Sequence, residues 1–136
     1  MPKITREEVR VPADVMPEAR DEYITNYLKA TRETGRLMLF ACDQKIEHLN
    51  KDFYGEGIDI ADLDPEHLFK IGSEGVCGVL AGQRGLVAQY AADYPEINYL
   101  IKMNSKTNLV GTKQEDPYSP QLYDLDAVLA MKEAGV

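Results

Sequence analysis

A short polar string follows the first strongly apolar run of the sequence. Residues 37–42 are apolar, and the string "DQKIEH" after them contains Asp43, Glu47 and His48. Burying ionisable groups costs free energy unless they are paired, so these side chains either form a solvated turn or line a site. A carboxylate such as Asp43 can act there as a general acid or base. An Asx turn or a helix cap explains Asp43 equally well, and both interpretations stay open.

Two further apolar runs carry or precede polar side chains. Lys102 lies inside the run "NYLIKM" at 98–103, and Gln83 follows the run "VCGVLA" at 76–81. A lysine in such a run must extend its amine to the edge of the sheet or pair with a carboxylate. Lys102 is therefore a candidate for a site or for a structural ion pair.

The histidines give little support for a metal site. His48 and His67 are the only two in the sequence, and His67 is expected on the surface near the start of a helix. A zinc site made of His48, Asp43 and Glu47 would not have the ligand spacing of known zinc sites. Glycine-rich phosphate loops are absent as well. We therefore predict no metal and no cofactor.

Alternating strands and helices must position these groups. The three apolar runs predict three strands, and a long loop is expected from the first of them to Asp64. Helix caps, apolar spacings and terminal glycines at Gly35, Gly75 and Gly135 predict the helices. The helices are expected at 18–34, 64–75, 85–95 and 124–135.

The order of strand and helix predicts an α/β fold with a parallel sheet. The strands are apolar on both faces, so we expect both faces of the sheet to be buried. Loops at the carboxyl ends of parallel strands hold the site in such folds. Asp43, Gln83 and Lys102 all lie at those ends, which favours a common site over three unrelated turns.

The composition of the chain limits which binding partners and which cellular compartment we expect. The chain has 136 residues, of which 44% are hydrophobic, and a formal charge of -8, so a nucleic-acid partner is not expected. Cys42 and Cys77 lie in apolar runs and are predicted to be reduced core residues. No stretch has the form of a signal peptide or a membrane span. We predict a cytoplasmic protein without a membrane partner.

Three segments carry a resemblance to a known family. They are "LMLFACDQKIEHLNKDFYGEG", "GVLAGQRGL" and "YLIKMNSKTNL". The sequence resembles the class I fructose-bisphosphate aldolases of the archaeal and bacterial type, which are related to deoxyribose-phosphate aldolase. Asp43 matches the active-site aspartate of that family, and Gln83 and Lys102 match polar positions at the ends of the next two strands.

The resemblance implies the amino-terminal portion of a (β/α)8 TIM barrel. Residues 36–136 would form about three β/α units, and residues 1–35 would form an extra N-terminal arm and helix. A complete barrel of this kind needs roughly 250 residues. The resemblance also places the Schiff-base lysine beyond Val136, so the chain alone is expected to be inactive.

The implied activity of the intact enzyme is that of a carbon–carbon lyase of glycolysis and gluconeogenesis. It would cleave fructose 1,6-bisphosphate reversibly to dihydroxyacetone phosphate and glyceraldehyde 3-phosphate through a Schiff base. Asp43 and Lys102 are the predicted catalytic residues, with Lys102 in a supporting electrostatic role. Gln83, Glu47 and His48 are predicted to bind substrate.

Two alternative functions remain open. One is another Schiff-base sugar-phosphate aldolase or a transaldolase-like synthase on the same barrel, and the other is a non-catalytic assembly subunit. Part of a barrel would leave the outer strands with unpaired backbone groups. The expected partners are therefore a sugar phosphate and the remainder of the barrel or other subunits, in a homo-oligomer.

Overall fold

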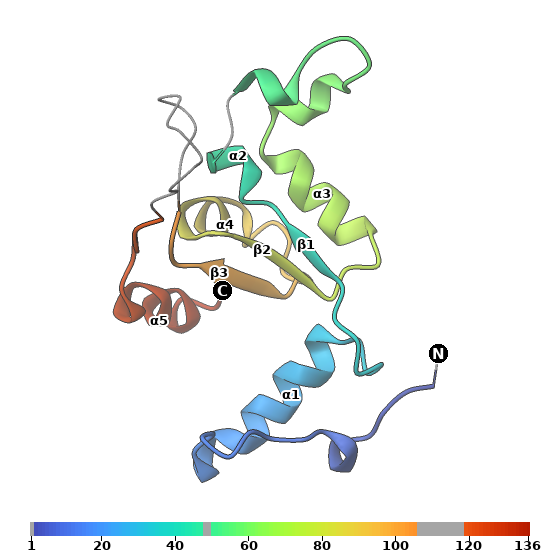
Figure 1. The fold of residues 1–136 in the computed structure, drawn as a ribbon, viewed down its shortest axis with the longest axis vertical. Coiled ribbons are helices and arrows are strands. Elements are labelled where there is room, and N and C mark those ends of the chain that lie inside the picture. Colours follow the sequence, from blue (N-terminus) through green and yellow to red (C-terminus); the bar gives the residue numbers. More distant parts are fainter. Residues whose placement is uncertain (1, 48–49, 106–118) are drawn as a thin grey trace.

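The computed structural model describes residues 2–47, 50–105 and 119–136, and its centre is a parallel sheet (Figure 1). In the described residues the sheet has three strands in the order β1-β2-β3. They are β1 (Leu39–Ala41), β2 (Val79–Gln83) and β3 (Tyr99–Lys102). The predicted α/β class and parallel sheet are confirmed.

A helix follows each strand, as the sequence predicted. These helices are α3 (Glu66–Glu74), α4 (Arg84–Tyr90) and α5 (Leu125–Glu133). Two aspartates hold the amino ends of helices. The Asp64 carboxylate accepts a bond from the Glu66 amide at 3.0 Å, and the Asp124 carboxylate accepts one from the Ala127 amide at 2.9 Å.

The long loop expected between β1 and α3 is wrong in part. The helical turn α2 (Gln44–Glu47) begins after only Cys42 and Asp43 have followed β1, and 3-10 turns come next at Asn50–Phe53 and Ile60–Leu63. The carbonyl of Asp43 accepts bonds from the amides of Ile46 and Glu47, both at 3.0 Å. A single helical turn shows no apolar periodicity, so the sequence pattern did not indicate it.

The second strand begins later than predicted. The apolar run at 76–81 predicted the strand, whereas β2 spans Val79–Gln83. Val76 is 76% exposed, and the amides of Gly78 and Val79 both bond to the carbonyl of Met38, where pairing with the first strand starts. Gln83 is consequently the last residue of the strand instead of part of the following loop.

The helices cover one face of the sheet. Phe40, Leu80 and Tyr99 are register partners across the three strands, and Phe69 from α3 packs on this row with none of its surface exposed. Cys42 joins the same core, where burial raises the pKa of its thiol to about 12. Cys42 and Cys77 are both free thiols. The predicted core position is confirmed for Cys42, while Cys77 is half-buried.

The opposite face of the sheet is apolar and open. Ala41, Ala81 and Leu100 are register partners on this face. Leu39 is 40% exposed and Leu100 43% exposed. The expectation that both faces are buried is therefore wrong for the described residues, because the helices that follow the strands all pack on one side.

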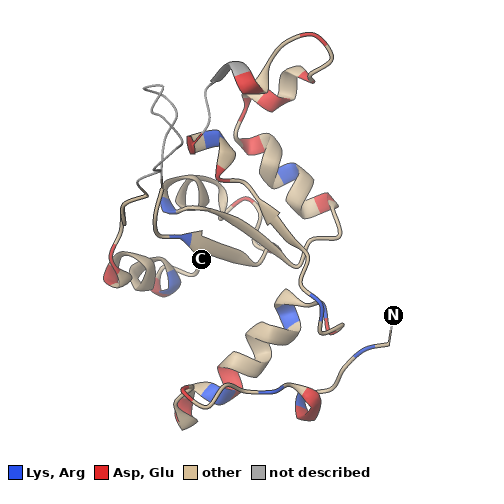
Figure 2. Ribbon diagram, viewed as in Figure 1, with Lys and Arg blue, Asp and Glu red and all other residues tan. Residues whose placement is uncertain are grey.

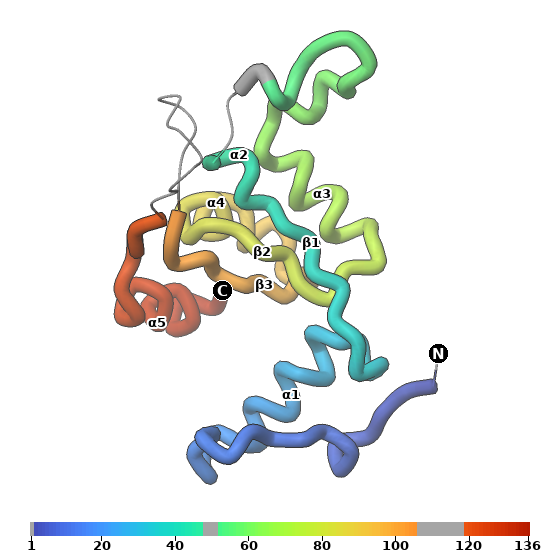
Figure 3. The backbone as a smooth tube through the Cα atoms, in the orientation of Figure 1, coloured from blue at the N-terminus to red at the C-terminus, as the bar shows by residue number. Residues whose placement is uncertain are grey.

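The helix α1 (Arg20–Ala30) lies below the amino ends of the strands (Figures 1 and 3). It ends before Gly35, because Arg32 and Glu33 adopt left-handed backbone angles. The contact with the sheet is close at Gly78, where an added Cβ would lie 1.8 Å from the carbonyl oxygen of Ala30. Only glycine allows this approach. Among the described residues, no helix has the length and apolar character needed to cross a membrane.

We expect Gly78→Ala to weaken the packing of α1 against the sheet, because the new methyl group would overlap the Ala30 carbonyl. The cost should be roughly 1–3 kcal/mol, which is typical of overpacking. Thermal unfolding followed by circular dichroism measures it. Gly85→Ala is the matched control, because an added Cβ there meets nothing within 4 Å. Equal melting temperatures for the two variants would contradict the close contact.

Candidate active site

A lysine and two carboxylates meet at the carboxyl ends of the strands. Lys102, the last residue of β3, donates from Nζ to Asp43 Oδ2 and to Glu47 Oε1, each at 2.6 Å. Asp43 follows β1, and Glu47 ends α2. Gln83, at the end of β2, is the register partner of Lys102. Four of the five predicted site residues therefore lie at one edge of the sheet.

The cluster is partly buried and carries more negative than positive charge. The side chains of Lys102, Asp43 and Glu47 are 27%, 22% and 10% exposed. Burial acts to lower the pKa of Lys102, but its hydrogen bonds to Asp43 and Glu47 and their charges outweigh burial and raise it. Lys102 is therefore a protonated ammonium at neutral pH, which cannot attack a carbonyl.

The geometry also distinguishes between the two interpretations of Asp43. Its carbonyl starts α2, whereas its carboxylate bonds to Lys102 across the sheet instead of to the amides of that turn. A pure Asx turn or helix cap would use the carboxylate locally. The carboxylate of Asp43 is thus available to the edge where the strands end.

Ser105 links Gln83 to the charged cluster. The Ser105 hydroxyl donates to Glu47 Oε1 at 2.9 Å, and Gln83 Nε2 donates to Ser105 Oγ at 3.4 Å. Ser105 is 7% exposed and Gln83 1% exposed. The sequence showed Ser105 only as one of several polar residues after β3, and no spacing signal identified it as a partner of Glu47.

Other polar residues near the strand ends do not join the cluster. Arg84 donates to the carbonyl of Ala127 at 3.3 Å, and Asn104 donates to Ser119 at 3.0 Å. His48 was predicted to bind substrate and lies outside the described residues. In the described part of the chain, no group of three or more His, Cys, Asp or Glu side chains is placed to hold a metal ion.

Lys45 occupies an unusual environment that the sequence did not indicate. Its Nζ is buried without a hydrogen-bond partner in the described residues and lies 4.0 Å from the centre of the Phe53 ring. Burial lowers its pKa, against the opposing charges of Asp62 and Asp64. Figure 2 shows that acidic residues recur along this segment between α2 and α3. Lys45 thus packs α2 against the following segment and does not face the cluster residues.

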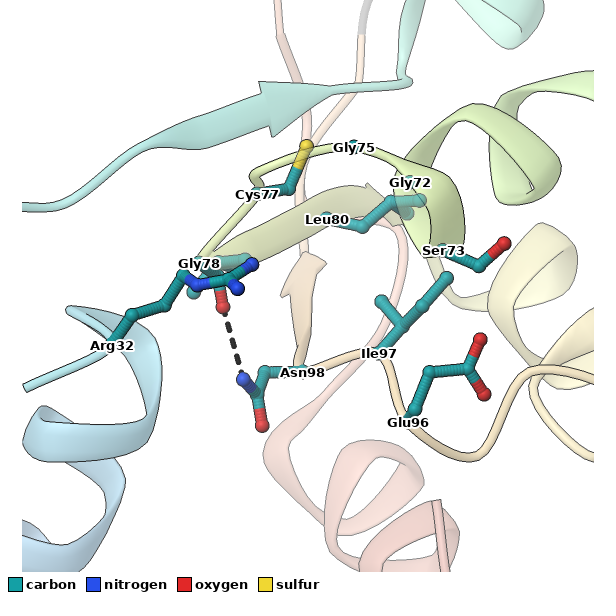
Figure 4. A pocket seen from close by; sticks show the side chains of 11 residues that line it. Arg32, Gly72, Ser73, Gly75, Cys77, Gly78, Leu80, Glu96, Ile97 and Asn98 are labelled. Carbon is teal, nitrogen blue, oxygen red and sulfur yellow. Dashed lines mark hydrogen bonds between the residues drawn. The ribbon is translucent and has the colours of Figure 1, made fainter.

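A cavity of about 330 Å³ lies at the other end of the sheet (Figure 4). Arg32, Gly78 and Asn98 are among its lining residues. The side-chain amide of Asn98 donates to the carbonyl of Gly78 at 3.0 Å. Gly78 and Asn98 directly precede β2 and β3. In α/β folds the site lies at the carboxyl ends of the strands, so this cavity is not the candidate active site.

A comparison with known protein families shows to which family the chain belongs. The model of the DeoC/LacD family aldolases matches residues 37–135, which include the whole sheet and the charged cluster. The chain belongs to the DeoC/LacD aldolase family. The family resemblance seen in the sequence is thereby confirmed, and the intact members of this family are aldolases.

Two relatives agree with this assignment. The "fructose-bisphosphate aldolase/6-deoxy-5-ketofructose 1-phosphate synthase" of Methanocaldococcus jannaschii is 51% identical over 132 residues, which are 96% of this chain and 42% of that protein. The solved structure of the fructose-bisphosphate aldolase from Slackia heliotrinireducens is 75% identical and superposes with a TM-score of 0.92. That match covers 99% of this chain and 42% of the Slackia chain.

The chain therefore spans less than half the length of these relatives. Its three parallel β/α units form part of a TIM-barrel aldolase, as the sequence predicted. The match to the family model begins at residue 37, after the N-terminal arm and α1. The division into an arm at 1–35 and a barrel portion at 36–136 stays a prediction.

We expect Lys102→Met to destabilise the protein, because it leaves two partly buried carboxylates without their shared cation. Breaking such a pair typically costs about 3–5 kcal/mol when fully buried, and less here because the side chains retain some exposure. Urea unfolding at pH 7 measures the loss.

The same variant carries a pH signature. The pKa of Lys102 in the folded protein is raised above its ordinary value of 10.5. Its stabilising contribution is therefore fully present below pH 10.5 and is lost as the pH rises through the folded pKa. The difference in unfolding free energy between wild type and Lys102→Met should shrink above pH 10.5. A difference that stays constant across that range would show that Lys102 is not bound as an ammonium.

Proposed function

We propose that this chain forms part of a Schiff-base aldolase that cleaves fructose 1,6-bisphosphate reversibly to dihydroxyacetone phosphate and glyceraldehyde 3-phosphate. The observation that carries the proposal is the shared ammonium of Lys102 between Asp43 and Glu47, at the carboxyl ends of strands in an aldolase family. The names of both relatives include fructose-bisphosphate aldolase, which supports this substrate.

The cleavage step needs a neutral lysine amine and a base. The amine attacks the ketone carbon of the substrate, and loss of water gives a protonated imine. The bond between C3 and C4 then breaks, its electron pair moves toward the imine to form an enamine, and the C4 hydroxyl loses its proton as it becomes the aldehyde. Asp43 is the base that takes this proton in our proposal.

Lys102 is unsuited to be that amine, because two carboxylates hold it in the protonated form. As the family resemblance implies, we place the imine-forming lysine outside this chain, in the part of the barrel that the relatives contain and this chain does not match. The chain alone should then be inactive. Lys102 instead orients Asp43 and limits the repulsion between the two carboxylates.

The charge of the cluster suggests how the substrate lies. Two carboxylates and one ammonium leave one negative charge in excess, which favours a cationic imine nearby and repels phosphate groups. The central carbons of the substrate should consequently face the cluster, while both phosphates bind at a distance. No metal is needed for this chemistry.

The open face of the sheet suggests the partner. Leu39 and Leu100 present apolar surface on the face opposite the helices, and β1 and β3 have unpaired outer edges in the described residues. We propose that the remaining strands of the barrel cover this face and pair with these edges, within a homo-oligomeric cytoplasmic enzyme of glycolysis and gluconeogenesis.

A second sugar-phosphate reaction has specific support. The name of the Methanocaldococcus jannaschii relative also includes 6-deoxy-5-ketofructose 1-phosphate synthase. That activity on a different sugar phosphate is the alternative for this chain. A panel of sugar phosphates distinguishes the two candidates.

The test uses a hybrid aldolase, in which this chain replaces the matched 42% of the Slackia heliotrinireducens protein. We expect the hybrid aldolase to cleave fructose 1,6-bisphosphate, and borohydride with dihydroxyacetone phosphate to trap an adduct on a lysine outside this chain. The isolated chain should give neither activity nor an adduct. An adduct on Lys102, or activity only on other sugar phosphates, would contradict the proposal.

Asp43→Asn in the hybrid aldolase should lower turnover by at least about 10²-fold, because the amide keeps the shape of the side chain and cannot accept the proton. The melting temperature should change little, since Lys102 keeps its bond to Glu47. Asp124→Asn is the matched control, because Asp124 caps α5 and an asparagine caps helices equally well. Normal turnover in a folded Asp43→Asn variant would remove Asp43 from the mechanism.

A further inference from the structure

We infer that Ser105, supported by Gln83, is a positioning residue that commits Glu47 to Lys102 and leaves Asp43 as the reacting carboxylate. This inference rests on the proposed aldolase function of the same site. It assigns different roles to two carboxylates that bind the same ammonium at the same distance of 2.6 Å.

The direction of each hydrogen bond in this chain of residues is determined by Glu47. An ionised carboxylate only accepts, so the single hydroxyl hydrogen of Ser105 points to Glu47 Oε1. Ser105 Oγ then accepts from Gln83, which requires the NH₂ group of Gln83 to face it. Gln83 therefore donates to Ser105, and Ser105 donates to Glu47.

This arrangement leaves the side-chain amide oxygen of Gln83 without a hydrogen bond in the described residues. This oxygen, Gln83 Oε1, is buried. Turning the amide over would place this oxygen against Ser105 Oγ, which already uses its hydrogen on Glu47. The site keeps an unsatisfied buried carbonyl so that the NH₂ group can support Ser105, and features of this kind concentrate at functional sites.

The two carboxylates differ in their surroundings as a result. Glu47 is 10% exposed, and its Oε1 accepts from both Lys102 and Ser105. Asp43 is 22% exposed, and within the described residues it accepts from Lys102 alone, through Oδ2. Glu47 is thus held in place as a counter-ion, while Asp43 has an oxygen to offer to a substrate hydroxyl.

The backbone places the Ser105 hydroxyl. The Ser105 amide bonds to the carbonyl of Pro120 at 3.1 Å, and the Leu122 amide bonds to the carbonyl of Met103 at 2.8 Å. Asn104 and Gln121 form an antiparallel bridge between these bonds. The hydroxyl therefore projects from a short, doubly bonded pair of segments and not from a single free loop.

Ser105→Ala in the hybrid aldolase should lower kcat about tenfold and change KM less than about twofold, because Glu47 loses a donor that holds it and no substrate contact is removed. Ser105→Thr keeps the hydroxyl and should restore most of the rate. Ser119→Ala is the matched control, since it removes a hydroxyl from the same pair of segments but outside the cluster.

A double-mutant cycle separates positioning through Glu47 from an independent effect. In a Glu47→Gln background, Ser105→Ala should lower kcat by less than about twofold, because the two changes act through one contact. Effects that multiply would overturn the inference. So would a Ser105→Ala variant with normal kcat, or a loss that Ser105→Thr does not repair.

A readout without catalysis separates this inference from the proposed function. Acetic anhydride labelling of Lys102, measured by peptide mass spectrometry, reports how firmly the ammonium is held. Ser105→Ala should raise the labelling rate of Lys102 at least about threefold, whereas Ser105→Thr and Ser119→Ala should not. If the hybrid aldolase fails to cleave fructose 1,6-bisphosphate while labelling follows this pattern, the proposed function fails and the positioning role stands. Equal labelling in all variants would refute the positioning role.

Discussion

The shared ammonium of Lys102 is the interaction on which the carboxyl end of the sheet depends. It connects the end of β3 to Asp43 and to Glu47, the last residue of α2, which lie 59 and 55 positions before Lys102 in the sequence. Two carboxylates at this depth would repel each other without a cation between them. The position of α2 and the charge at the edge of the sheet therefore both follow from one side chain.

The two ends of the sheet are built for different purposes. At the amino end, Gly78 lets the last carbonyl of α1 pack closely against the strands, and the side-chain amide of Asn98 donates to the carbonyl of Gly78. At the carboxyl end, ionisable groups are only partly buried, and the buried amide oxygen of Gln83 has no hydrogen-bond partner among the residues that the structure describes. In TIM-barrel enzymes the amino-terminal face of the barrel usually serves stability, and the carboxyl-terminal face holds the active site.

Much of this architecture could be predicted from local signals. Asp64 and Asp124 mark helix starts because their carboxylates bond to backbone amides, and apolar runs mark the strands because parallel strands are buried. The turn α2 could not be predicted, because four residues give no periodicity. The role of Ser105 was equally hidden, since it depends on a side-chain contact with Glu47 across 58 positions of the chain. Asp43 and Lys102 could be suggested from their places at strand ends, but their direct pairing required the structure.

The protonation state of Lys102 is the central claim, and nitrogen-detected NMR of its side chain in the hybrid aldolase tests it most directly. The Nζ resonance should be that of an ammonium at neutral pH and should titrate with a pKa above 10.5. In an Asp43→Asn, Glu47→Gln double variant the pKa should fall, because burial then acts without the two carboxylates. A neutral amine in the wild-type protein near pH 8, or a pKa that the double variant leaves unchanged, would contradict the shared ammonium and reopen Lys102 as the nucleophile.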